Sequence, residues 1–233
     1  MLGQVDPKEF WENKILVWEE SRYAQKSGDV TEKIAGAASS SLRFRVQAAV
    51  ELLAPFVAGR KVVELGCGSG FLAESLIAKG AIDYRGIDIS ERAIDAARQR
   101  IAGSASASKI TFEALPVDKL TDLGDAIVFS LGLFDWLTPE EIDKVFEVGK
   151  HGSFLHAVAE RRPGSIIQAI HKLYVYFSYG HRTGGYVPQY HTFRQIEAAA
   201  ERVGFKNIRP YRDDRMRFGI FVTDLPVSAA RLP

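Results

Sequence analysis

A glycine-rich segment between an apolar run and a helical pattern carries the clearest chemical signal in this sequence. Lys61–Leu76 reads KVVELGCGSGFLAESL, with Gly66, Gly68 and Gly70 alternating after the apolar run. A glycine turn between a strand and a helix lets a ligand approach the backbone where no Cβ intrudes, and the helix offers free N–H groups and the positive end of its dipole. The segment therefore predicts a small-molecule binding site.

The spacing of the glycines narrows the choice of ligand. A dinucleotide-binding loop has the pattern G-x-G-x-x-G, whereas Phe71 stands here where the third glycine would be. Glu64, two residues before the loop, would repel a diphosphate, but a carboxylate suits a ligand with an ammonium or sulfonium centre. The pattern thus favours a cationic ligand over a pyrophosphate.

Glu64–Gly70 (ELGCGSG) resembles motif I of the class I S-adenosylmethionine-dependent methyltransferases. Tyr84–Ile89 (YRGIDI) is an apolar-alternating strand that ends near Asp88, similar to the acidic residue with which that family holds the ribose hydroxyls. The resemblance covers residues 43–223 approximately, and it implies S-adenosylmethionine as cofactor. The cofactor-binding residues that we expect are Glu64, Gly66, Cys67, Gly68, Gly70, Asp88, Ile89, Ala114, Leu115, Ser130, Arg43 and Tyr23.

The sequence departs from the family pattern after the third strand. Many members carry an acidic residue near the adenine, whereas this chain reads Phe112-Glu113-Ala114-Leu115-Pro116. We therefore expect adenine recognition by the backbone groups of Ala114 and Leu115.

Methyl transfer to a hydroxyl requires donor and acceptor in line and a base that removes the proton. Asp135 lies just beyond the fourth predicted strand, between Phe134 and Trp136, whose apolar side chains would raise its pKa. Asp135 would equally suit a turn at which it accepts hydrogen bonds from backbone amides. His191 and His181 are the preferred bases, because an unperturbed imidazole titrates near neutral pH.

Residues 161–190 form an insertion between the fifth strand and the last helix, where members of the resembled family build acceptor pockets. The segment contains Ile166–Tyr179, an aromatic-rich predicted helix, and then a glycine-containing loop with His181 and Arg182. Aromatic faces with polar side chains suit a polyhydroxylated acceptor such as a sugar, although a helix packed on the sheet would show the same pattern. The predicted substrate-binding residues are Phe134, Trp136, Glu160, Tyr179, Arg182, Tyr186 and Tyr190.

Strand and helical patterns alternate along the chain, which predicts a doubly wound α/β fold with ligands at the carboxyl ends of the strands. The resemblance implies a mostly parallel, Rossmann-like sheet of seven strands with helices on both faces and an antiparallel last strand. The strands are expected near residues 61–65, 82–89, 109–113, 125–131, 154–159, 205–211 and 217–223. The helices are expected near residues 6–24, 42–57, 71–79, 90–101, 139–149, 166–179 and 192–203.

The predicted organisation is an N-terminal helical cap (residues 1–41), a methyltransferase domain (42–224) with the acceptor-binding insertion, and a tail (225–233). Gly36–Ser41 (GAASSS) is small and polar and is expected to be a flexible link. In the cap, Arg22 and Tyr23 are candidates to cover the ligand. His156 alternates with apolar neighbours within the fifth strand and is interpreted as a hydrogen-bonded core histidine.

Composition limits the remaining functional classes. The 233 residues carry a formal net charge of +1, which disfavours nucleic acid as a partner. The single cysteine, Cys67, and the absence of a long apolar run or signal-peptide pattern favour a cytoplasmic protein without a membrane span. The histidines and carboxylates show no metal-ligand spacing, so metal-free catalysis is expected.

Together these patterns predict a methyltransferase that modifies a hydroxyl of a small acceptor, with a sugar or glycan precursor as the hypothesis for its class. Three alternatives remain open at this point. They are an N-methyltransferase of a small amine or nucleotide sugar, an NAD-dependent dehydrogenase on the same fold, and a non-catalytic subunit that binds S-adenosylmethionine. The sequence predicts no oligomeric state.

Overall fold

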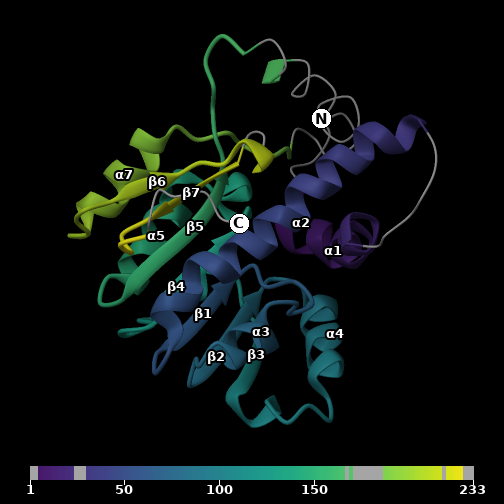
Figure 1. The fold of residues 1–233 in the computed structure, drawn as a ribbon, viewed down its shortest axis with the longest axis vertical. Helices are drawn as coiled ribbons and strands as arrows, with labels where there is room; N and C mark the ends of the chain where they lie inside the picture. The colour runs from purple at the N-terminus through teal and green to yellow at the C-terminus, as the bar shows by residue number, and fades with distance from the viewer. Residues whose placement is uncertain (1–4, 24–29, 166–167, 170–185, 217–218, 228–233) are drawn as a thin grey trace.

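The computed structural model describes residues 5–23, 30–165, 168–169, 186–216 and 219–227 (Figure 1). Its centre is a seven-stranded sheet in the order β3-β2-β1-β4-β5-β7-β6. Strands β1 to β5 are mutually parallel, and β7 runs antiparallel to both of its neighbours, β5 and β6. The predicted fold class is confirmed. The strands are β1 (Lys61–Leu65), β2 (Asp83–Asp88), β3 (Ile110–Ala114), β4 (Ile127–Leu131), β5 (Ser153–Ala159), β6 (Arg209–Tyr211) and β7 (Gly219–Thr223).

Helices cover both faces of the sheet because the strands are apolar on both sides. In β1, Val62 packs into the core beneath α2 (Val30–Val57), α3 (Ala73–Ala78) and α4 (Glu91–Ile101), whereas Val63 packs toward α5 (Pro139–Gly149) and α7 (Phe193–Arg202). Figure 1 shows α2 crossing one face of the sheet, and α5 and α7 on the other. In the described part of the chain, short 3₁₀ helices connect these elements: η1 (Ala107–Lys109), η2 (Val117–Lys119), η3 (Leu133–Trp136) and η5 (Asp214–Met216).

Predicted helix starts are confirmed where a side chain caps the helix. Ser90 accepts a hydrogen bond from Ala93 N at the start of α4. Capping boxes begin α5 and α7, through Thr138 with Glu141 and Thr192 with Gln195. These caps involve residues only three positions apart, so the local sequence is enough to place them.

Two predicted boundaries are wrong. The expected link Gly36–Ser41 is helical and lies within α2, because alanine and serine are tolerated in a helix and a single glycine costs it only about 1 kcal/mol. The predicted boundary between residues 41 and 42 therefore falls inside one helix. Strand β6 begins at Arg209, later than the predicted residue 205, because Asn207 has a φ of 57° and cannot continue an extended strand.

The N-terminal helix α1 (Pro7–Tyr23) forms as predicted and lies beside α2 and α4 (Figure 1). Most of the predicted helix at residues 166–179 lies outside the described residues. Among the helices that the structure describes, none is both long and apolar enough to span a lipid bilayer.

Candidate functional site

The glycine loop between β1 and α3 adopts a backbone that requires glycine. Gly68 has a φ of 51° and Gly70 a φ of 70°, both in the left-handed region. A Cβ on Gly70 would lie 2.5 Å from the Phe112 ring, and one on Gly68 would lie 2.0 Å from Glu19 Oε1. The loop is thus closed on one side by β3 and on the other by a carboxylate from α1.

Protein acceptors occupy the backbone N–H groups of this loop. Gly66 N and Cys67 N both donate to the Ile87 carbonyl, at 2.7 and 3.1 Å. Gly68 N donates to Asp88 Oδ2 at 2.9 Å, and Ser69 N donates to Glu19 Oε1 at 3.0 Å. A phosphate-binding loop needs these donors free for the ligand. Here two of them already bind carboxylates.

Three buried carboxyl groups surround the loop: Glu19, Glu64 and Asp88. Burial raises the pKa of all three, and that of Glu64 reaches about 8. The Tyr84 hydroxyl donates a hydrogen bond to Glu64 Oε2. Repulsion from neighbouring carboxylates adds to this effect of burial in each case. A cationic ligand would supply a compensating positive charge.

A fourth carboxylate, Glu12 on α1, lies nearby. Its Oε1 accepts a hydrogen bond from Arg92 N in the first turn of α4, while its buried Oε2 has no hydrogen-bond partner among the described residues. Its negative charge contributes to the raised pKa of Asp88, which also accepts a hydrogen bond from Ser90 N. Asp88 and Glu12 therefore lie together at the end of β2, and Glu12 Oε2 is still able to accept a hydrogen bond. This arrangement suits hydroxyl or amino donors of a ligand.

The carboxyl group of Asp135 lies just beyond the carboxyl end of β4. Asp135 on η3 accepts a hydrogen bond from Ala159 N through Oδ1, and burial raises its pKa to about 7 although Arg45 opposes the shift. A Cβ on Gly132 would lie 3.5 Å from Asp135 Oδ2 and 3.1 Å from Arg45 Nη1. Both groups thus face the same point beyond β4.

An aromatic cluster closes this end of the site. It consists of Phe10 and Trp11 from α1, Trp136 from η3 and Tyr186 from the returning chain, with ring centroids 4.9–5.7 Å apart. Trp11 Nε1 also donates a hydrogen bond to the Tyr186 hydroxyl at 3.2 Å. The cluster joins α1 to η3 and to Tyr186, and the role of α1 as a cap stays a prediction.

Comparison with known proteins shows what the chain resembles. Residues 62–150 match the family model described as a methyltransferase domain. This part of the chain is thus similar to a methyltransferase domain. The fold of the chain is also similar to that of the magnesium protoporphyrin IX methyltransferase from Synechocystis PCC 6803, solved with bound S-adenosylhomocysteine. That likeness has a TM-score of 0.71 and 17% identity and covers 93% of this chain and 96% of the other.

Sequence relatives match only part of the methyltransferase domain. The ubiquinone biosynthesis O-methyltransferase of Bordetella avium (strain 197N) is 38% identical over 71 residues, which are 30% of this chain and 28% of the relative. The ribosomal protein L11 methyltransferase of Shewanella baltica (strain OS185) is 35% identical over 97 residues, or 40% of this chain and 33% of the relative. The chain therefore spans about a third or less of the length of these relatives.

The predicted donor-binding residues differ in what the structure leaves available to a ligand. Cys67 packs its thiol into the core beside Gly86, and its backbone N–H and carbonyl are already hydrogen-bonded to Ile87 and Gly70. Leu115 N already donates to the Asp88 carbonyl, and Ala114 pairs with Asp88 in the sheet. Ser130 is fully buried and its hydroxyl lies 2.9 Å from His156 Nδ1, so its side chain has no exposed surface for a ligand.

His156 lies in the core, as the sequence pattern indicates. Its ring stacks on Phe134 at 4.4 Å and on Phe154 at 5.4 Å, and burial lowers its pKa to about 3. The Phe134 side chain is itself fully buried, so this predicted substrate-binding residue instead packs against His156 in the core. Both rings belong to the core on the α5 and α7 side of the sheet.

His191 lies next to β5 and is held by hydrogen bonds. Its Nε2 is 2.8 Å from the Phe134 carbonyl, so this nitrogen donates and Nδ1 remains as the acceptor. Burial lowers its pKa, although the hydrogen bond to Phe134 opposes the shift. Tyr190 precedes it, and burial, with a smaller contribution from Asp135, raises the pKa of that phenol to about 12. The structure thus brings His191, Tyr190 and Asp135 to one edge of the sheet.

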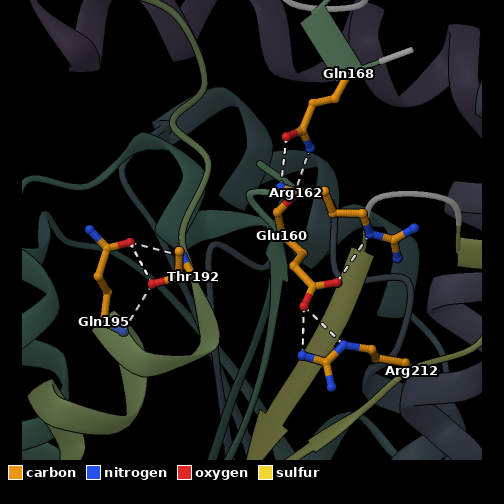
Figure 2. Close-up of polar contacts among 6 residues, drawn as sticks. All are labelled: Glu160, Arg162, Gln168, Thr192, Gln195 and Arg212. Atoms are coloured by element: carbon orange, nitrogen blue, oxygen red, sulfur yellow. Dashed lines mark hydrogen bonds and ion pairs between the residues drawn. The ribbon is translucent and has the colours of Figure 1, made fainter. Parts of the chain in front are cut away.

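Glu160, a predicted substrate-binding residue, is held between two arginines at the end of β5. Figure 2 shows its carboxylate accepting from Arg212 Nε and Nη2 through Oε1, at 2.9 and 2.6 Å, and from Arg162 Nε through Oε2 at 3.2 Å. Gln168 donates to the Glu160 carbonyl and accepts from Arg162 N. These contacts give Glu160 a structural role at the rim of the site.

Several predicted residues have no described side chain. Tyr179, His181 and Arg182 lie outside the described residues, and their roles stay predictions. Tyr23 and Arg43 lie on α1 and α2, but their side chains are outside the described part of the structure. Among the described residues, no group of three or more histidine, cysteine, aspartate or glutamate side chains is placed to hold a metal ion.

Sequence reasoning missed two of the acidic residues of α1. Glu12 and Glu19 are seven positions apart, with the buried Ile15 between them on the same helical face. Carboxylates that share a stripe with a buried residue are unusual in an amphipathic helix and must face another part of the protein. The spacing of Glu12, Ile15 and Glu19 could therefore have indicated that these carboxylates face the rest of the protein.

Proposed function

We propose that this protein is an S-adenosylmethionine-dependent methyltransferase that acts on a small acceptor. The observation that carries the proposal is the occupation of the glycine loop by carboxylates, with Glu19 and Asp88 accepting the N–H groups of Ser69 and Gly68. The methyltransferase domain match and the fold likeness support the same conclusion.

The residues present fit a cationic donor. When bound, S-adenosylmethionine supplies a methyl group on a positively charged sulfur, together with an ammonium group. Glu19 and Glu64 would hold these charges, since opposite charges about 4 Å apart attract by about 4 kcal/mol at the effective dielectric constant of a partly buried site. Asp88 and the open Oε2 of Glu12 would receive ribose hydroxyls or amino groups at the end of β2.

A dehydrogenase is disfavoured by the same contacts. The pyrophosphate of a dinucleotide would need the loop N–H groups that Asp88 and Glu19 already accept, and it would lie beside two further carboxyl groups. Repulsion between these charges would weaken binding. Phe71, which stands in place of the third glycine of a dinucleotide-binding loop, also disfavours a dehydrogenase.

For the acceptor, we propose a hydroxyl deprotonated by Asp135. A pKa of about 7 leaves this carboxylate largely ionised at pH 8 and able to accept a proton, as the base of a catalytic methyltransferase must be. His191 is the second candidate base, through its open Nδ1. An O-methyltransferase among the sequence relatives also favours oxygen over nitrogen as the accepting atom.

The aromatic rings of Trp136 and Tyr186 support a sugar or an aromatic ring as the acceptor scaffold, because both stack on such faces. We keep the sugar or glycan precursor as the first class to test. Cytoplasmic location and independence of metal ions remain predictions.

The test is incubation with methyl-labelled S-adenosylmethionine and a panel of sugars, phenols and amines, followed by mass spectrometry. We expect label on hydroxyl compounds, and turnover that falls in Asp135→Asn with S-adenosylhomocysteine affinity unchanged. Label on amines alone would contradict the hydroxyl assignment, and absence of both donor binding and turnover would contradict the function.

A further inference from the structure

The guanidinium of Arg45, on α2, has no hydrogen-bond or ion-pair partner among the described residues. Its buried Nε donates to no described acceptor, and Asp135 is a charged group that its charge influences from a distance. Removing a charged donor from water without a partner is costly, so such groups are normally paired. A ligand with negative charge would supply such a partner.

The guanidinium lies at the acceptor side of the sheet. Its Nη1 is 3.1 Å from a Cβ built on Gly132, directly after β4, and its Nη2 is 3.0 Å from one built on Gly219. Gly219 pairs with Ala159 at the carboxyl end of β5. The donor carboxylates, in contrast, surround the loop after β1 and the end of β2.

The two halves of this edge also differ in charge. Around the glycine loop lie four carboxyl groups from α1, β1 and β2. Beyond β5, the guanidinium groups of Arg162 and Arg212 both pair with the carboxylate of Glu160. The acidic groups around the glycine loop suit a cationic methyl donor. The arginines beyond β5 suit an anionic acceptor.

We propose that Arg45 binds a carboxylate of the acceptor, so that the methylated molecule is a hydroxy acid; this inference rests on the proposed function. Arg45 Nη1 and Asp135 Oδ2 lie 3.1 and 3.5 Å from the same point above Gly132. One small molecule can therefore place its carboxylate on Arg45 and its hydroxyl near Asp135. A guanidinium binds a carboxylate with two parallel hydrogen bonds, which also orients the hydroxyl.

Calorimetry at pH 8 with matched probes tests this proposal without relying on turnover. The probes are 4-hydroxybenzoate against 4-hydroxybenzyl alcohol, and glucuronate against glucose, each titrated with and without saturating S-adenosylhomocysteine. We expect the wild type to bind at least one acid about tenfold more tightly than its neutral partner. Arg45→Gln should lose that preference, and Arg45→Lys should retain part of it. Arg194→Gln, at a side chain 89% exposed, is the matched control.

The outcomes separate the possible sources of the carboxylate. If Arg45→Gln weakens S-adenosylhomocysteine about tenfold and leaves the acid preference intact, the guanidinium serves the donor's own carboxylate and the proposal is overturned. Equal binding of acid and neutral probe to the wild type, or binding of none of the probes, overturns it without any variant. Retained acid preference without methyl transfer would contradict the proposed function but leave the assignment of Arg45 standing.

Discussion

Replacement of Glu64 by glutamine should change how stability depends on pH. Glu64 is 4% exposed, and burial raises its pKa from 4.5 to about 8. Between these values the unfolded carboxylate is ionised while the folded one holds its proton, so the unfolded state binds fewer protons and stability falls as pH rises. The wild type should therefore lose up to about 1.4 kcal/mol per pH unit relative to Glu64→Gln across this window. The glutamine carbonyl can still accept the Tyr84 hydroxyl.

Urea unfolding followed by tryptophan fluorescence from pH 5 to 9 measures this difference. The exposed Glu201 on α7 provides the control variant, Glu201→Gln, which should follow the wild type throughout. Saturating S-adenosylmethionine should reduce the pH slope, because its positive charge favours the ionised Glu64. Parallel curves for wild type and Glu64→Gln would refute the reasoning about the buried carboxylates.

Three further variants test other parts of the site. Gly68→Ala should weaken S-adenosylhomocysteine at least about tenfold, because a left-handed alanine costs about 1–2 kcal/mol and its Cβ would displace Glu19; an unchanged dissociation constant in calorimetry would argue against the loop. Asp135→Asn should remove a kinetic pKa near 7 from the pH profile of kcat, and retention of that pKa would transfer the role of base to another group. Glu160→Gln should lower the free energy of unfolding by about 1–2 kcal/mol, because the half-exposed Arg162 and Arg212 then lose their shared carboxylate and repel each other. An unchanged midpoint of urea unfolding would mean that water screens these ion pairs too strongly for them to contribute to stability.

The geometry of the proposed donor side could be predicted from the sequence because its signals are local. Gly66, Gly68 and Gly70 follow one strand directly, and Asp88 ends the next strand, so spacing alone brings them to one edge of the sheet. Glu19 could not be placed in this way. It reaches Ser69 from 50 residues earlier in the chain, and that contact depends on how α1 packs against α4.

The acceptor side was harder to predict because its chemistry depends on burial and on contacts between distant segments. Asp135 was predicted either to accept backbone N–H groups at a turn or to have a raised pKa. The structure shows both features, because Asp135 accepts a hydrogen bond from Ala159 N and burial raises its pKa to about 7. Glu160 was expected at the substrate, but Arg212, 52 residues later, pairs with it. No local pattern around residue 160 contains that information.

The most direct test of the central claim is a calorimetric titration of the purified protein at pH 8 with S-adenosylmethionine and, separately, with NAD. The account predicts stoichiometric binding of S-adenosylmethionine, weakened in Glu19→Gln, and no binding of NAD. Binding of NAD with none of S-adenosylmethionine would contradict it.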